Sequence, residues 1–102
     1  MLQHLKDPVG ALVQAARIAD AVVVTETDWM PGRYDDLQGM ILFESDSPYA
    51  WYQVKPPLIK AVLSRMGFGE FTVEFHKQAG SIGERYGVQV PHFTVAGRYV
   101  IP

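Results

Sequence analysis

The stretch from Trp51 to Phe68 constrains the fold more than any other part of the sequence. Two prolines, Pro56 and Pro57, suit the first turn of a helix, where a missing backbone N–H costs little. The apolar residues after them recur at helical spacing and form one stripe, made of Leu58, Ile59, Val62, Leu63 and Met66. Gly67 then stands where a left-handed C-terminal cap is expected. The pattern predicts an amphipathic helix over residues 55–66, with a strand after it.

The first third of the chain predicts a second helix and a strand. Asp7 is a good N-cap acceptor, and Pro8 suits the first helical position. The apolar residues after them share one helical face over residues 8–18, namely Val9, Leu12, Val13 and Ala16. Residues 21–26 begin with AVVVT, a β-branched run without alternation. Such a run indicates a strand that is buried on both faces.

The last third of the chain predicts two strands. Phe71, Val73 and Phe75 alternate with polar residues, so we expect a strand over 71–77 with these three side chains inward. Residues 90–100 form another strand, and a glycine-punctuated loop over 78–88 joins the two. Because no helix intervenes, the last strand is expected to pair antiparallel. The fold class is therefore α/β, in a single domain over residues 1–102.

Residues 28–50 form the longest irregular region. Its aromatic side chains argue against simple disorder, and they are Trp29, Tyr34, Phe43 and Tyr49. Residues 39–43 (GMILF) are either a short strand or a buried plug. A loop of this length in a compact domain is usually either functional or mobile.

Composition sets the class of protein. The chain has 102 residues, of which 48% are hydrophobic, as expected for one small globular domain. A formal net charge of −2 argues mildly against a nucleic-acid partner. The absence of cysteine excludes disulfides, thiolate metal sites and a cysteine nucleophile. No apolar run reaches the roughly 20 residues of a membrane span, and no signal peptide is visible. We expect a soluble cytoplasmic protein.

Five stretches resemble parts of the C-terminal half of class I (Rossmann-like) S-adenosylmethionine-dependent methyltransferases. Residues 2–8 (LQHLKDP) resemble the family segment L-x-H-L-x-D-P after the fourth strand, and residues 21–26 resemble the fifth strand. Residues 51–68 resemble the last helix with its M/L-x-x-x-G-F ending. Residues 71–75 and 92–98 resemble the sixth and seventh strands. The resemblance implies a partial Rossmann-like sheet and a role on the substrate side of a methyltransferase.

The family's cofactor-binding half has no counterpart in this sequence. The glycine-rich loop after the first strand and the acidic residue after the second strand are both missing. The run Gly67-Phe68-Gly69 does not replace the loop, because it follows a helix and precedes a strand. The resemblance therefore implies a truncated, methyltransferase-like fragment that is inactive alone. It would bind S-adenosylmethionine only if the missing half is supplied.

The missing half leaves one strand of the expected sheet with an open edge. The resemblance implies the strand order 21–26, then 90–100, then 71–77, with the family's fourth strand absent beside residues 21–26. An apolar open edge invites pairing with another chain. The expected partner is either the missing N-terminal half or a second copy, which would make a homodimer through strand 21–26.

Five residues are candidates for binding cofactor or substrate. The resemblance places His4 where the family meets its cofactor or substrate; the alternative is a surface histidine near a chain end. Glu26 and Asp28 follow a strand, so they either orient a substrate or are solvated loop carboxylates. Trp51 and Tyr52 either line a small-molecule substrate pocket or are core under a loop. No catalytic residue is assigned, because methyl transfer depends mainly on holding the two reacting groups in line.

Other polar residues carry weaker signals. His76 and His92 lie on neighbouring strands, but their spacing is not that of a metal site, and none is predicted. The scattered basic residues are interpreted as solvated surface, and they are Arg33, Lys55, Arg65 and Arg85. The alternative function is a stand-alone oligomeric module that binds a small ligand or a protein, with an aromatic pocket in loop 28–52. An in-frame glycine-rich stretch upstream of Met1 would favour the methyltransferase half over this module.

Overall fold

The computed structural model describes residues 2–43, 50–78 and 90–100, and it has the predicted α/β organisation. Its elements in chain order are a short 3-10 helix η1 (Leu2–His4), α1 (Pro8–Ile18), β1 (Ala21–Thr27), β2 (Met40–Leu42), β3 (Tyr52–Val54), α2 (Pro56–Arg65), β4 (Phe68–Gln78) and β5 (Val90–Tyr99). Both predicted helices and all three predicted strands are confirmed. The predicted glycine-punctuated loop over residues 78–88 lies outside the described residues, apart from residue 78, which ends β4. Tyr49 also lies outside them.

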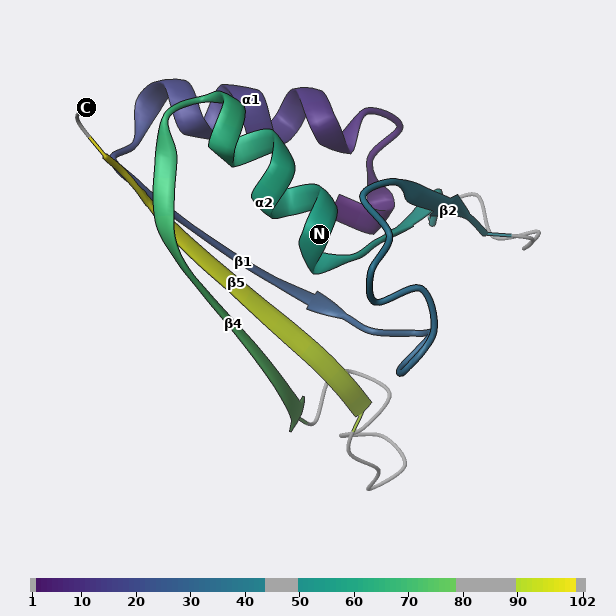
Figure 1. The fold of residues 1–102 in the computed structure, drawn as a ribbon. Coiled ribbons are helices and arrows are strands. Elements are labelled where there is room, and N and C mark those ends of the chain that lie inside the picture. Colours follow the sequence, from purple (N-terminus) through teal and green to yellow (C-terminus); the bar gives the residue numbers. More distant parts are fainter. Residues whose placement is uncertain (1, 44–49, 79–89, 101–102) are drawn as a thin grey trace.

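The main sheet has the predicted strand order β1-β5-β4. β5 lies in the centre and pairs antiparallel with both neighbours, so Val95 stands between Val24 and Val73. Both α-helices lie on one face of this sheet (Figure 1). Within the described residues, β1 pairs on one side only. The expected open edge is therefore present. Neither described α-helix has the length and apolar content that a bilayer crossing requires.

β1 is buried on one face, and the prediction of burial on both faces was wrong. Val22 and Glu26 are 8% and 3% exposed, whereas Val23 between them is 67% exposed. The continuous apolar run suggested a parallel sheet with helices on both faces. An antiparallel sheet tolerates one solvated face, and here the face opposite the helices is uncovered in the described structure.

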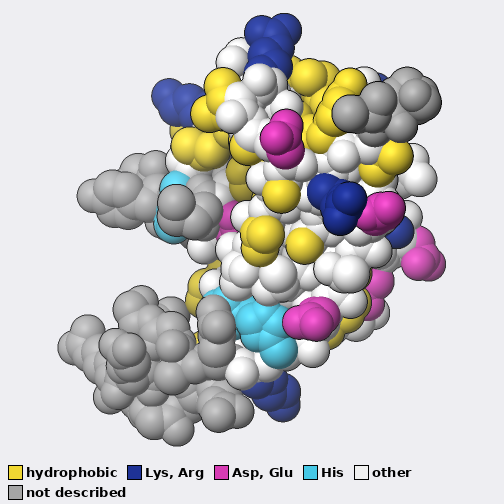
Figure 2. All heavy atoms as spheres, turned by 90° about the vertical axis from the view of Figure 1, so that its left-hand side faces the viewer, with side chains coloured by type: hydrophobic (Ala, Val, Ile, Leu, Met, Phe, Trp, Pro, Cys, Tyr) yellow, Lys and Arg dark blue, Asp and Glu magenta, His cyan; other side chains and the backbone are white. Residues whose placement is uncertain are grey.

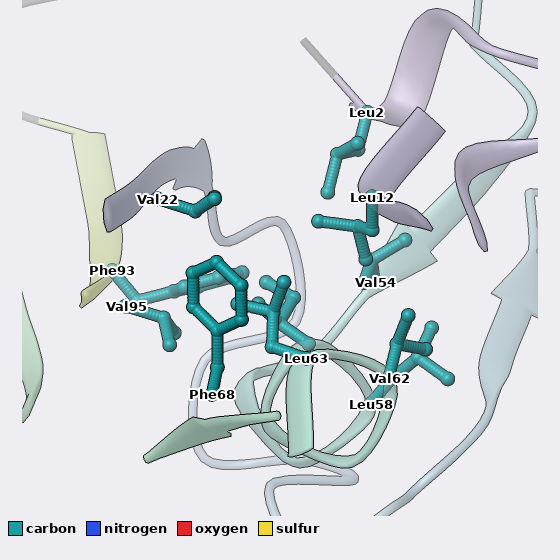
Figure 3. Packing of buried hydrophobic residues seen from close by; sticks show 11 residues of the cluster. Leu2, Leu12, Val22, Val54, Leu58, Val62, Leu63, Phe68, Phe93 and Val95 are labelled. Atoms are coloured by element: carbon teal, nitrogen blue, oxygen red, sulfur yellow. The ribbon is translucent and has the colours of Figure 1, made fainter. Parts of the chain in front are cut away.

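The hydrophobic core lies between the two helices and the sheet (Figure 3). Ile59 and Leu63 of α2 are completely buried, as are Phe93 and Val95 of β5. Leu12 provides the central contact from α1 and is 2% exposed. Full burial of one such side chain stabilises the fold by about 1.5–3 kcal/mol. The periodicity of both helices therefore identified the correct core faces.

Phe75 departs from its predicted inward position. It shares the helix-facing side of β4 with Phe71 and Val73, but it is 60% exposed. A hollow of about 530 Å³ lies beside it, with a lining that includes Pro56, Pro57 and Phe75. Alternation therefore predicted the correct face, but α2 does not cover the end of that face.

The long loop contains a strand, which decides between the two interpretations of residues 39–43. β2 pairs antiparallel with β3, with Ile41 opposite Gln53. This second, two-stranded sheet projects at one end of the molecule (Figure 1). It brings β3 and the start of α2 to the end of β1.

Gly67 has the predicted left-handed cap geometry. Its φ is +88°, and its N–H donates to the Ser64 carbonyl oxygen at 3.1 Å. A Cβ at this position would lie 2.7 Å from Tyr99 Cε2. We expect Gly67→Ala to lower the free energy of unfolding by about 1–2 kcal/mol through backbone strain alone, with an added cost from the Tyr99 contact. Urea denaturation measures this loss. Gly32→Ala is the control, since Gly32 has φ +73° but open space around it. An equal loss of unfolding free energy in both variants would show that the Tyr99 contact adds no cost.

Candidate functional site

Three segments of the chain meet at the C-terminal end of β1. The backbone N–H of Leu2 in η1 donates to the buried Glu26 carboxylate. The Trp51 N–H donates to the Gln3 carbonyl oxygen at 2.6 Å, which joins η1 to the start of β3. The Asp28 N–H donates to the Pro91 carbonyl oxygen at 2.9 Å. In open α/β sheets this end of the strands is where ligands bind.

A buried ammonium group holds the loop after β1. The Lys55 side chain is fully buried, and its Nζ donates to Asp28 Oδ1 at 2.9 Å and to Asp35 Oδ1 at 2.8 Å. A third bond reaches the Met30 carbonyl oxygen at 2.7 Å. All three ammonium hydrogens can therefore be bonded. Lys55 was predicted to be a solvated surface residue, and this prediction was wrong.

Burial of this cluster is costly and must be offset by its geometry. Removing a charge from water costs several kcal/mol, so an ion pair is retained only where its hydrogen bonds are complete. Asp28 is 3% exposed, and its Oδ1 also accepts from the Met30 N–H at 3.1 Å. Asp35 is the solvated member, at 41% exposed. The cluster fixes the loop after β1 to the N-terminus of α2.

Gln53 fixes the same loop from β3. Its side chain is 1% exposed, and its Oε1 accepts from the Trp29 backbone N–H at 3.0 Å. Its Nε2 donates to the Thr27 and Val54 carbonyl oxygens at 3.2 and 3.1 Å. The backbone on both sides of Asp28 is thereby bonded to a buried amide.

Trp29 is held at its ring as well as at its backbone. The indole Nε1–H donates to Gln3 Oε1 at 2.9 Å, although the Trp29 residue is 46% exposed. A cavity of about 240 Å³ lies beside it, lined by Gln3, His4, Trp29, Phe43 and Ala50. We call this the Trp29 cavity. It contains one predicted site residue, His4.

A larger cavity lies on the other side of the loop, and it has a volume of about 370 Å³. Its lining includes Asp28 and Asp35 of the buried cluster, together with His76 and His92. The two imidazole rings stack with centroids 5.9 Å apart, and His92 Nε2 lies 3.2 Å from the Thr27 hydroxyl. Among the described residues, no three side chains of the metal-binding types gather to hold an ion.

The predicted site residues separate into three groups. His4 lines the Trp29 cavity, where a binding role stays a prediction. Glu26 and Asp28 are buried and bonded within the chain, so the solvated interpretation was wrong for both. The Lys6 Nζ lies over the Trp51 ring, 5.2 Å from the ring centroid. Tyr52 packs against the hydrophobic core. Neither of these aromatic residues lines a described cavity near the site.

The residues that position the loop were not predicted from the sequence, and they are Gln3, Gln53 and Lys55. The sequence around each of these three residues gave no signal of its role, because the groups that they bond are distant in the chain. Lys55 Nζ bonds residues that are 20 to 27 positions away. Trp29 was noted only as one aromatic residue of the long loop, although it is the second residue after the end of β1.

Charged side chains of both signs are interspersed over the face shown in Figure 2, without a patch of one sign. Arg33 and Arg65 are exposed, as predicted, whereas Arg85 lies outside the described residues. Clustered Lys and Arg, which nucleic-acid surfaces typically carry, are not seen among the described residues of this face.

Comparison with solved structures finds a likeness to the N-terminal domain of EvdMO1 with SAH bound. The likeness covers 98% of this chain and 43% of that chain, with a TM-score of 0.58 and 21% sequence identity. No protein-family model and no curated protein matches the sequence. At this identity the likeness shows the fold alone. The chain thus has the α/β fold of part of an SAH-bound domain and spans less than half of its length.

Proposed function

We propose that this chain is the substrate-side half of an S-adenosylmethionine-dependent methyltransferase domain and is inactive alone. SAH is what remains of S-adenosylmethionine after its methyl group is transferred, so the neighbour that contains SAH supports this chemistry. The resemblance of residues 2–8 and 51–68 to methyltransferase segments supports it independently.

The open edge of β1 is the observation that carries the proposal. β1 has seven residues, and no strand pairs with its outer side within the described structure. The strand contains neither Pro nor Lys, which would protect an open edge against strand addition. α1 and β1 together line a groove of about 230 Å³ along this edge, with Leu12, Ala15 and Val24 among its residues. Val23 is exposed on the other face. A further strand beneath α1, with cover over Val23, would complete the structure.

The Trp29 cavity by itself does not accommodate the whole cofactor. The Trp29 cavity has about 240 Å³. This volume is below the range of roughly 300–1,000 Å³ that pockets for drug-sized ligands occupy. The nearest buried carboxylates, Glu26 and Asp28, are bonded within the chain. This chain would therefore supply the wall for the methyl acceptor, while the other half would supply the cofactor site.

Complementation by the other half tests the proposal. A polypeptide from the same genome with the glycine-rich loop is mixed with the chain, and amide hydrogen exchange is followed. We expect the outward amides of Ala21–Thr27 to exchange at least about 10-fold more slowly in the complex. The outer edge of β4 serves as an internal control and should not change. Protection of both edges, or of neither, would contradict the proposal.

A pair of charge variants sharpens this test. Val23→Lys places a cation on the exposed side of the edge strand, a device that prevents strand addition. Glu74→Lys adds the same side chain on β4, at a residue that is also exposed. We expect Val23→Lys to abolish complementation and Glu74→Lys to preserve it. Loss of complementation in both variants would point to a general charge effect.

A stand-alone binding module is the second candidate function. It is favoured by the Trp29 cavity, which combines aromatic and polar residues among its described lining. In that case a second copy would cover the edge of β1 and make a homodimer. Light scattering distinguishes the two functions, since a module of this kind is dimeric at high concentration, whereas the half domain remains a monomer until its complement is added.

A further inference from the structure

We infer that the Trp29 cavity binds a planar aromatic or heteroaromatic ring, stacked on the indole of Trp29. The assignment of that ring as the methyl acceptor rests on the proposed function, but the binding itself does not. The inference depends on how Trp29 is held, on what its bonds leave available, and on the shape of the cavity beside it.

Trp29 is fixed before any ligand arrives. Its backbone N–H is bonded to Gln53, which is 1% exposed, and its indole N–H is bonded to Gln3. The preceding residue, Asp28, is bonded to the fully buried Lys55. Buried polar groups are costly, and several of them converge on this short segment. A side chain ordered in advance loses little conformational entropy on binding.

The bond to Gln3 uses the only ring donor of Trp29, so a ligand would contact this side chain through the carbon surface of the indole. An indole has one hydrogen-bond donor, Nε1–H, and Gln3 Oε1 already accepts from it. The residue is nevertheless 46% exposed, which is unusual for a large aromatic side chain held so firmly. Aromatic faces favour other aromatic rings in offset or edge-to-face geometry, by about 0.5–1.5 kcal/mol beyond area burial.

The cavity beside the indole has a size and lining that suit a ring. Its volume of about 240 Å³ is enough for a one- or two-ring molecule and too small for the intact cofactor. Phe43 and Ala50 are apolar lining residues, while Gln3 and His4 add polar groups. The described part of the lining, which is mostly apolar with a few polar groups, suits a flat, weakly polar ligand.

Nuclear magnetic resonance of the chain provides a direct test, with phenol and cyclohexanol as probes. The sequence has two tryptophans, so Trp51→Phe leaves Trp29 as the sole source of an indole N–H signal. We expect phenol to shift this signal saturably, with a dissociation constant about fivefold lower than that of cyclohexanol. The two probes have similar size, so the ratio isolates the contribution of the ring.

Variants of Trp29 test whether the indole is responsible. With the Ala50 amide as the readout, Trp29→Leu should abolish the preference for phenol. Trp29→Tyr retains a ring without the Nε1–H donor, and we expect it to bind phenol about threefold more weakly than the chain with Trp29 does. This variant tests the role of the ring if Trp29→Leu is unfolded. Equal affinity for the two probes, no saturable shift by phenol, or an unchanged preference in these variants would overturn the inference.

The outcome is separable from that of the proposed function. Phenol binding without methyl transfer by the complemented domain would overturn the methyltransferase proposal and leave the ring site standing. Methyl transfer by the complemented domain without a preference for phenol would overturn the ring site and leave the methyltransferase proposal standing.

Discussion

Replacing Lys55 with methionine is expected to lower the free energy of unfolding by about 3–5 kcal/mol. The substitution preserves most of the aliphatic volume but leaves the buried Asp28 carboxylate without its cation. It also removes the bonds from Nζ to Asp35 and to the Met30 carbonyl oxygen. Small domains are stable by only about 5–15 kcal/mol, so this loss would leave the chain close to unfolding at room temperature.

Urea denaturation followed by circular dichroism measures the effect of Lys55→Met. Lys60→Met is the matched control, since Lys60 lies on the exposed side of α2 near the Phe71 ring and should cost less than about 1 kcal/mol. The double variant Lys55→Met/Asp28→Asn should recover at least about 1 kcal/mol by removing the unpaired charge. A Lys55 loss no larger than that of Lys60 would show that the buried cluster does not hold the loop.

Replacing Phe93 with alanine is expected to destabilise the chain by about 3–5 kcal/mol. Phe93 is completely buried in the central strand of the sheet, and its ring lies among the side chains of both helices and the strands in the core (Figure 3). Its removal leaves a cavity that rigid neighbouring strands cannot close. The cost therefore exceeds that of the lost transfer energy alone.

Phe75→Ala is the control for Phe93→Ala in the same denaturation experiment. The two rings are cross-strand partners with centroids 6.5 Å apart, but Phe75 is 60% exposed. We expect its loss to be about 1 kcal/mol, in the range of a cross-strand aromatic pair. Similar losses for both variants would mean that the hollow beside α2 is closed in solution and that Phe75 is part of the core.

The sequence predicted the elements well because each has a local cause. Asp7 caps α1 through its bond to the Gly10 N–H at 2.9 Å, and proline begins each helix. The strand order came from the family resemblance, since strand patterns alone do not determine which strand lies in the centre. The error at β1 arose because an apolar run does not reveal whether a second layer is present in the same chain.

Much of the candidate site could not be predicted, because it depends on contacts between distant segments. Nothing in the local sequence distinguishes Lys55 from an exposed lysine, and its burial results from Asp28 and Asp35 being brought to it by the fold. The role of Gln53 likewise requires the pairing of β2 with β3. Trp29 was recognisable as a candidate only by its place two residues after a strand end.

The central claim is that this chain provides half of a methyltransferase domain and binds the cofactor only when completed. The most direct measurement is calorimetric titration of S-adenosylmethionine into the purified chain, first alone and then with the complementary half. The predicted result is no saturable heat for the chain alone and micromolar binding, one molecule for each complex, once the half is present. Saturable micromolar binding by the chain alone, or none by the complex, would contradict it.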